Sequence, residues 1–252
     1  MPSQRSYSGS NFSYSFGPGQ VTPAVKILIA LNVVAFLAQN VSPELTLLLG
    51  LRPADVLLDL KIWQPFTYMF LHGGLAHILF NMLSLWMFGV ELERVWGTPF
   101  FSRYYAITGV GAGLCTVLVS LLPFGFAQQM YLAVTIGASG AIYALLLAYA
   151  LYFPHRQIIF IIFPLPARVF VMILGGMALL FSISSQQGGV AHIAHLSGLV
   201  IGYLYLRGGS LRVHPLAELR YRYNKWRIDR MRRRFDVYSG GRRGDDIDRR
   251  IH

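Results

Sequence analysis

A serine and several histidines stand inside long apolar segments of this 252-residue chain. Ser139 lies among small residues in the stretch TIGASGAIYALLLAYAL, and His195 lies in the later stretch AHIAHLSGLVIGYLY. A serine hydroxyl is a weak nucleophile that becomes reactive when a neighbouring base, most often histidine, accepts its proton. If the two segments pack together, Ser139 and His195 form a dyad that can transfer an acyl group.

A second polar pair, His77 and Asn81, lies in the apolar stretch LHGGLAHILFN. Residues four apart share one face of a helix, so both side chains point the same way. Their N–H groups, together with the backbone N–H of Ser139, are candidate donors to the oxyanion that forms during acyl transfer. No Asp or Glu stands at this depth in the apolar segments, so we expect Tyr143, one turn after Ser139, to orient His195 by stacking.

Small residues surround both members of the predicted dyad. Gly137 and Gly140 flank Ser139, and Gly198 and Gly202 follow His195 with the spacing GxxxG. Such residues let the backbones of membrane helices approach closely. A serine in a cluster of this kind is usually a packing residue, but close packing is also what the dyad requires.

The composition is that of a membrane protein. Hydrophobic residues make up 54% of the chain and charged residues only 13%, with a mean hydropathy of +0.48. Soluble domains carry about 25% charged residues. Residues 42–72 mix charged and aromatic residues, which favours an interfacial element, and residues 157–166 are too short to span. The apolar stretches predict six spans, at about residues 24–41, 74–90, 104–122, 133–153, 167–183 and 190–206.

Positive charge orients these spans, because cytoplasmic connections carry an excess of Lys and Arg. The connections after the second and fourth spans contain arginines, and more than half of the 22 basic residues follow residue 211. Both termini are therefore predicted to be cytoplasmic, which places the polar groups in the outer half of the membrane. The predicted organisation is a disordered tail at 1–22, a membrane domain at 23–208 and a basic tail at 209–252.

The motifs HGGLAHILFN, ELERVWG, GASG and AHLSGLVIG, in that order over six spans, resemble a rhomboid intramembrane serine protease of the bacterial six-helix type. The resemblance covers about residues 24–206. It implies an all-α polytopic bundle of six transmembrane helices with an interfacial first loop. It also implies a multi-pass protein of the bacterial inner membrane.

The resemblance implies roles for individual residues. Ser139 matches the nucleophile, His195 the base, and His77 with Asn81 the oxyanion hole. One departure is that Gln64 follows Trp63 where the family often has arginine, which concerns a loop contact only. The remaining matches are supporting residues. Tyr143 packs against the base, His72 lies in a water-retaining region, and Glu93 pairs with Gly97 to tie adjacent helices together. Gly137 and Gly198 are the supporting glycines of the motifs around Ser139 and His195.

The sequence thus predicts an intramembrane serine endopeptidase that cleaves transmembrane segments of other membrane proteins near the outer face. Its predicted partners are those substrates and membrane lipids, without nucleic acid; the oligomeric state is not indicated. No cofactor or metal is predicted, because the chain has no HExxH motif and no intramembrane carboxylate. The alternative is a catalytically silent rhomboid-like protein that binds membrane proteins.

Two further segments have two interpretations each. The loop ISSQQGG, residues 183–189, could be a mobile lid over the site or a plain connector. The tail stretch LAELRYRYNKWRIDRMRRRF has the spacing of a basic amphipathic helix on the inner leaflet, or it could be a solvated cytoplasmic tail. His192 has no assigned role and is interpreted as a structural or solvent-facing histidine.

Overall fold

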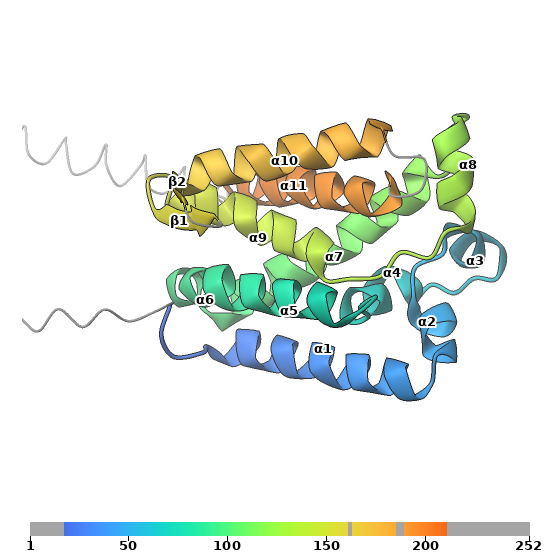
Figure 1. The fold of residues 1–252 in the computed structure, drawn as a ribbon, viewed down its shortest axis with the longest axis horizontal. Helices are drawn as coiled ribbons and strands as arrows, with labels where there is room; N and C mark the ends of the chain where they lie inside the picture. The colour runs from blue at the N-terminus through green and yellow to red at the C-terminus, as the bar shows by residue number, and fades with distance from the viewer. Residues whose placement is uncertain (1–17, 161–162, 185–188, 211–252) are drawn as a thin grey trace, which may run out of the picture. The chain divides into compact units, whose positions relative to one another are not determined.

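The computed structural model describes residues 18–160, 163–184 and 189–210 of the chain. By contacts between residues, the described residues up to Leu206 form one compact unit, and a second unit begins at Arg207. The first unit is a helical bundle whose long helices run roughly along one direction (Figure 1).

Each predicted span contains a helix in the described part of the chain. Two of these, Pro23–Val41 and the continuous helix Leu75–Trp96, are long and apolar enough to cross a membrane by length and composition. The count of six spans and their direction across the membrane stay predictions. The long helices are α1 (Pro23–Val41), α5 (Leu75–Ser84) continuing through the π-helical turn η2 (Leu85–Gly89) into α6 (Val90–Trp96), α7 (Thr98–Val119), α9 (Ser139–Tyr152), α10 (Ala167–Ser184) and α11 (Gly189–Ser210).

Short elements cap the two ends of the bundle in Figure 1. Beside the ends of α6 and α9 lies an antiparallel hairpin of β1 (Gln157–Phe160) and β2 (Phe163–Pro166), in the segment predicted to be too short to span. At the opposite end lie α2, α3 and α8. The short helices are α2 (Glu44–Leu49), α3 (Pro53–Leu58), α4 (Gln64–Thr67), the 3-10 turn η1 (Tyr68–Phe70) and α8 (Gly125–Leu132).

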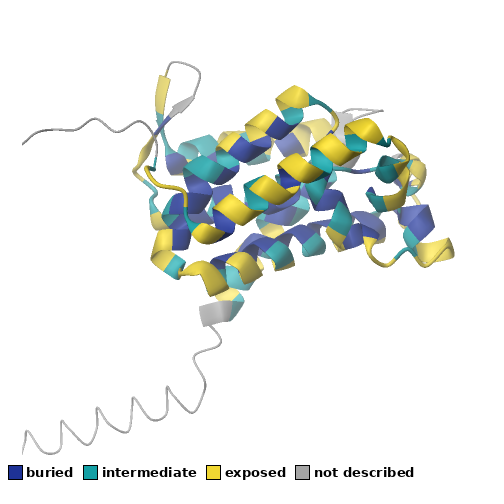
Figure 2. Ribbon diagram, turned by 90° about the horizontal axis from the view of Figure 1, so that it is seen from below, coloured by how far each residue is buried: buried dark blue, intermediate teal, exposed yellow. Residues whose placement is uncertain are grey.

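The surface of the bundle is apolar. Figure 2 shows buried residues on the inner faces of the helices and exposed residues on the outer faces. Many of the exposed residues are large hydrophobics, among them Leu37, Phe80 and Leu180, which are 59%, 66% and 67% exposed. Extended apolar surface of this kind is typical of a protein whose outer faces contact lipid.

Glu93 joins the start of α1 to α6 and α7. Its carboxylate accepts hydrogen bonds from the backbone N–H groups of Ala24 and Val25, at 2.9 and 3.1 Å, and from the hydroxyl of Thr22. The hydroxyl of Thr98 donates to it at 2.6 Å. A carboxylate at a helix N-terminus satisfies N–H groups that have no partner within the helix and complements the helix dipole. The pairing of adjacent helices implied for Glu93 has this physical basis here.

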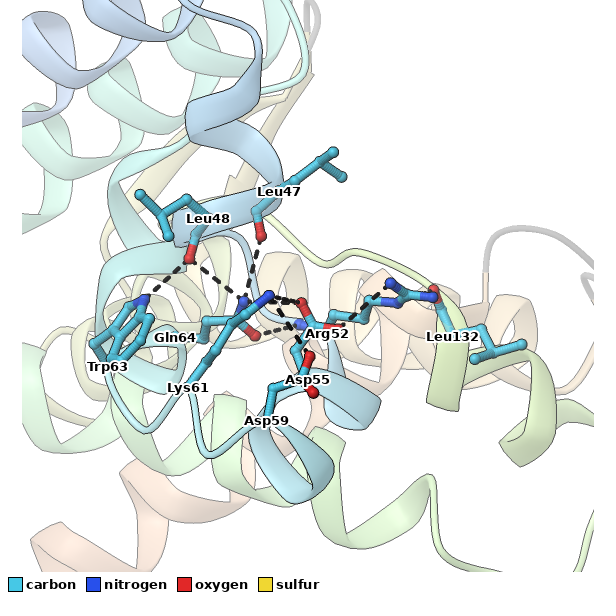
Figure 3. A network of polar contacts seen from close by, with 9 residues as sticks. All are labelled: Leu47, Leu48, Arg52, Asp55, Asp59, Lys61, Trp63, Gln64 and Leu132. Carbon is cyan, nitrogen blue, oxygen red and sulfur yellow. Dashed lines mark hydrogen bonds and ion pairs between the residues drawn. The ribbon is translucent and has the colours of Figure 1, made fainter.

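Gln64 holds the connection between α1 and α5 together, at the position where the resemblance leads one to expect arginine (Figure 3). Its side-chain oxygen accepts the N–H of Arg52 at 3.0 Å, and its amide nitrogen lies 3.4 Å from the carbonyl oxygens of Leu47 and Leu48. Glutamine has both a donor and an acceptor, so it can satisfy backbone groups of both kinds. Although Gln64 departs from the Trp-Arg pattern, its side-chain hydrogen bonds therefore hold the backbone of this loop together.

Asp55 forms the charged part of the same network (Figure 3). Its carboxylate accepts a hydrogen bond from Lys61 at 2.7 Å and lies 3.4 Å from Arg52. Burial raises the pKa of this carboxyl, but the hydrogen bonds from Lys61 and Gln64, with the charges of Lys61 and Arg52, outweigh burial and leave the pKa below its usual value.

The segment before Ser139 is extended, whereas the sequence predicted a span that begins near residue 133. Leu51 and Thr135 exchange both backbone hydrogen bonds, at 2.9 and 2.8 Å, and the N–H of Gly137 donates to the carbonyl of Tyr68 at 2.9 Å. Since these bonds satisfy the backbone without a helix, the apolar stretch stays non-helical until Ser139. The predicted start of this span was therefore wrong, because hydropathy alone does not distinguish a buried strand from a helix.

Candidate active site

Ser139 is the first residue of α9 and follows directly on the extended segment. Gly137, two residues earlier, has a φ of +129°, which L side chains rarely adopt, and a Cβ there would lie 2.9 Å from Nε2 of His77. The first N–H groups of a helix have no partner within it and lie at the positive end of its dipole. Ser139 therefore sits where negative charge is stabilised.

His195 on α11 lies next to Ser139. The Nε2 atom of His195 and the Oγ atom of Ser139 are 2.7 Å apart, which is a hydrogen-bond distance. The ring of Tyr143 stacks on the imidazole with centroids 4.2 Å apart and an interplanar angle of 5°. In the described part of the chain, Nδ1 of His195 is buried without a hydrogen-bond partner. Among the described residues, the stack on Tyr143 and the contact with Ser139 therefore hold this ring, and no carboxylate bonds its Nδ1.

The close approach of α9 and α11 depends on glycine. A Cβ on Gly198 would collide with the carbonyl oxygen of Gly140 and lie 2.9 Å from its carbonyl carbon. One turn further on, a Cβ on Gly202 would lie 2.8 Å from the Cβ of Ala144. The GxxxG spacing thus lets the two backbones touch, as expected for small residues between membrane helices.

His77 and Asn81 share one face of α5, as their spacing predicts. The N–H of Gly73 donates to Nδ1 of His77 at 3.2 Å, so Nδ1 is an acceptor and a neutral imidazole carries its proton on Nε2. That Nε2–H lies beside Gly137. The amide of Asn81 donates to the carbonyl of His77 at 2.8 Å, which uses one of its two N–H groups.

His72 is 1% exposed, and neither of its ring nitrogens has a hydrogen-bond partner among the described residues. Its ring packs edge-to-face on His77, with centroids 5.0 Å apart. The backbone of His72 is held by Gln39 of α1, whose side chain bonds both its N–H and its carbonyl. His72 thus adjoins the site through His77 and not through Ser139.

A single cavity of about 390 Å³ brings the predicted residues together. Ser139, His195, His77, Asn81 and Tyr143 all line it, although they come from three separate helices. The rest of the lining is mostly apolar, which keeps the polar groups in surroundings of low polarity. These other residues belong to α5, η2, α9 and α10: Ala76, Phe80, Ser84, Phe88, Ile142, Leu146, Phe170 and Leu174.

Other predicted features lie beside the cavity or outside the described residues. The ring of His192 stacks on Phe181 at 5.3 Å and contacts His195 edge-on at 5.9 Å. Among the described residues no group of three or more potential ligands could hold a metal ion. Residues 185–188, the centre of the possible lid, and most of the two predicted tails are not described.

Sequence reasoning missed Gln39, Tyr68 and the α10 residues of the cavity. Gln39 was detectable in principle, since a polar residue inside an apolar span marks a functional or structural role. Tyr68 acts through its backbone carbonyl, which no residue type reveals. Phe170 and Leu174 are ordinary apolar residues of α10 and carry no signal that they would face this cavity.

The fold and the site together define a helical membrane bundle with a serine–histidine pair in an open cavity between its helices. A sequence profile of the rhomboid domain matches residues 59–210, more than half of the chain. The chain belongs to the rhomboid family, a family of helical membrane proteins.

Curated relatives share 28–30% of the aligned residues. The chain is 30% identical over 137 residues to Rhomboid protein 1, mitochondrial, of Saccharomyces cerevisiae, which covers 54% of this chain and 38% of the yeast protein. It is 29% identical over 180 residues to Rhomboid protease GlpG of Haemophilus influenzae, covering 71% and 86%. For Rhomboid protease GlpG of Salmonella typhi the identity is 28%, covering 71% and 60%. The matched region is thus less than two thirds of the yeast and Salmonella proteins.

Proposed function

We propose that this protein is an intramembrane serine endopeptidase that cleaves transmembrane segments of other membrane proteins near the outer face. The observation that carries the proposal is the 2.7 Å distance between Ser139 Oγ and His195 Nε2, in a cavity that also contains His77 and Asn81. Relatives named rhomboid proteases support the same reaction.

In the proposed mechanism, Oγ of Ser139 attacks the carbonyl carbon of the scissile peptide bond while Nε2 of His195 accepts the hydroxyl proton. The Nε2–H of His77, the amide of Asn81 and the N–H of Ser139 donate to the oxyanion. His195 then gives its proton to the leaving amine, which leaves an acyl-enzyme. A water molecule, deprotonated by His195, hydrolyses this ester and restores Ser139.

The substrate class follows from where the cavity lies. Its lining includes Phe80, which is 66% exposed on α5, and Phe170 and Leu174 of α10. An apolar substrate segment can therefore contact these side chains while its backbone reaches Ser139. A transmembrane helix bonds its carbonyls internally, so a substrate must unwind locally before one of them is attacked. In the proposed topology both termini are cytoplasmic and the dyad is in the outer half of the membrane.

The test is cleavage of a model transmembrane substrate by the purified full chain in detergent and in liposomes. We expect Ser139→Ala and His195→Ala to abolish cleavage, because each removes one member of the dyad. Ser42→Ala is the matched control, since this exposed hydroxyl donates to the Glu44 carboxylate just after the end of α1. Labelling of Ser139 by a serine-reactive phosphonate, lost in His195→Ala, reports the activated nucleophile independently of the substrate.

The outcomes separate the two candidate functions. The peptidase is supported if the wild type and Ser42→Ala cleave the substrate and both dyad variants do not. The dyad variants must still elute and melt as the wild type does. Equal cleavage by all four proteins indicates a contaminating enzyme. If the wild type neither cleaves any of several substrates nor reacts with the phosphonate, the result favours the silent binding protein instead.

A further inference from the structure

The side chain of Gln39 forms two hydrogen bonds with the backbone of His72, in the segment that leads into α5. Its Oε1 accepts the backbone N–H of His72 at 3.1 Å, and its Nε2 donates to the carbonyl of the same residue at 3.1 Å. The two bonds fix which end of the amide is oxygen, because only one orientation satisfies both. Gln39 lies in the last turn of α1, 33 residues from its partner in sequence.

The segment that Gln39 binds also contacts His77. Gly73, the residue after His72, donates its N–H to Nδ1 of His77 at 3.2 Å. The ring of His72 packs against the ring of His77, with centroids 5.0 Å apart and an interplanar angle of 71°. This hydrogen bond and this ring contact to the His77 imidazole therefore both come from the dipeptide His72–Gly73, and Gln39 bonds the N–H and the carbonyl of its first residue.

The hydrogen bond from Gly73 also selects the tautomer of His77. An imidazole whose Nδ1 accepts a hydrogen bond must carry its proton on Nε2. Nε2 lies beside Gly137, two residues before Ser139, where the oxyanion donor is needed. If the backbone at residues 72 and 73 shifted, Nδ1 would lose its donor and the proton could move from Nε2 to Nδ1.

We propose that Gln39 is a positioning residue for the oxyanion hole, which holds His77 as the Nε2–H tautomer through the backbone of His72 and Gly73. This inference rests on the proposed function. Gln39 does not line the cavity and contacts neither member of the dyad. Among the described residues, the bonds of Gln39 reach the site through His72 and Gly73 to His77. Because Glu93 binds the first turn of α1 and Gln39 acts from the last turn, α1 is fixed at both ends.

The test uses Gln39→Met, which keeps an unbranched side chain of similar length but removes both hydrogen bonds. Gln39→Glu is the second variant, since its carboxylate still accepts from His72 N–H but cannot donate to the carbonyl. The matched control is Asn40→Leu, because Asn40 is the neighbouring exposed amide and its side chain donates to the carbonyl of Phe36 in its own helix. Each variant is purified as the full chain and its melting temperature is measured.

The first readout does not depend on activity. In protein labelled with ¹⁵N-histidine, the wild type and Asn40→Leu should give a single Nε2–H signature for His77, assigned by its loss in His77→Ala. Gln39→Met should give a mixture of both tautomers. A pure Nε2–H signature in Gln39→Met overturns the inference, whether or not the protein cleaves any substrate.

The second readout is a double-mutant cycle on cleavage. Removing an oxyanion donor costs about 10²–10³ in kcat, so partial loss in Gln39→Met should lower kcat about 10-fold with KM unchanged. Gln39→Glu should fall between this variant and the wild type. In a His77→Ala background, Gln39→Met should cause no further loss. An equal 10-fold loss in that background would mean that Gln39 acts only on overall structure. An inactive wild type would contradict the proposed function and leave the tautomer readout to decide the role of Gln39.

Discussion

Replacing Gly198 by alanine tests whether the contact between α9 and α11 sets the geometry of the dyad. Gly198 lies three residues after His195, on the same face of α11, and it touches the backbone of Gly140, the residue after Ser139. One added methyl group would therefore act on the spacing of the two helices, because the three atoms nearest to it all belong to the backbone of Gly140.

The expected magnitude follows from the distances. The new Cβ would lie 2.9 Å from the carbonyl carbon of Gly140 and would overlap its oxygen, whereas contacts of carbon atoms are most favourable at about 3.5–4.0 Å. Relieving the overlap requires α11 to recede by on the order of 1 Å. The hydrogen bond between Ser139 and His195 would then lengthen from 2.7 Å to about 3.7 Å, beyond hydrogen-bond range. A misplacement of about 1 Å can cost about 100-fold in rate.

The assay is kcat/KM for a model transmembrane substrate, with the melting temperature measured on the same samples. We expect Gly198→Ala to lose about 100-fold in kcat/KM, equivalent to about 2.7 kcal/mol, and to lose about 1–3 kcal/mol of stability from overpacking. Gly176→Ala in α10 is the matched control, since a Cβ there meets nothing within 4 Å. Activity of Gly198→Ala within a few-fold of the wild type would refute the reasoning that this contact places His195.

Three other substitutions probe separate parts of the structure. Gly137→Ala should lower cleavage about 100-fold, because the new Cβ would push the His77 ring away and the positive φ of residue 137 is strained for alanine. An unchanged kcat would contradict this. Tyr143→Phe should stay close to wild-type activity, whereas Tyr143→Ala should lose about 10-fold, as expected if stacking on His195 is what matters; equal losses would assign the role to the hydroxyl. Asp55→Asn should be less stable than the wild type above about pH 5, with the difference shrinking below about pH 4, because the lowered pKa makes the ionised carboxyl stabilising and acid removes that charge. Melting curves across this pH range measure the difference, and a gap that does not change with pH would show that the charge of Asp55 contributes nothing.

Residue types and periodicity were enough to locate the long helices approximately and to predict which polar residues meet, but not the short helices or the start of α9. The i, i+4 spacing of His77 and Asn81 and the glycines around Ser139 and His195 are local signals, because each depends on the geometry of one helix. The structure brings all four polar residues to one cavity. Their roles in catalysis remain the proposal that the dyad variants test.

What the sequence could not reveal depends on contacts between distant parts of the chain. The extended conformation before Ser139 results from backbone bonds to Leu51 and Tyr68, which hydropathy does not encode. Gln39 reaches the site through the backbone of His72, so its partner has no recognisable side-chain type. Gln64 in place of arginine is a further example, because its effect depends on which backbone groups lie within reach.

The late start of α9 determines how deep Ser139 lies in the proposed topology. Its 14 residues measure about 21 Å, whereas the hydrocarbon core of a bilayer is about 30 Å thick. In the proposed topology, with the far end of α9 at the cytoplasmic boundary, Ser139 lies about 9 Å below the outer boundary. Because the length of α9 is fixed, each additional ångström of bilayer thickness must submerge Ser139 further or be absorbed by tilt and local thinning. In the proposed mechanism, a thicker bilayer would therefore reduce the access of water to the acyl-enzyme. The same protein should then deacylate more slowly in thicker bilayers.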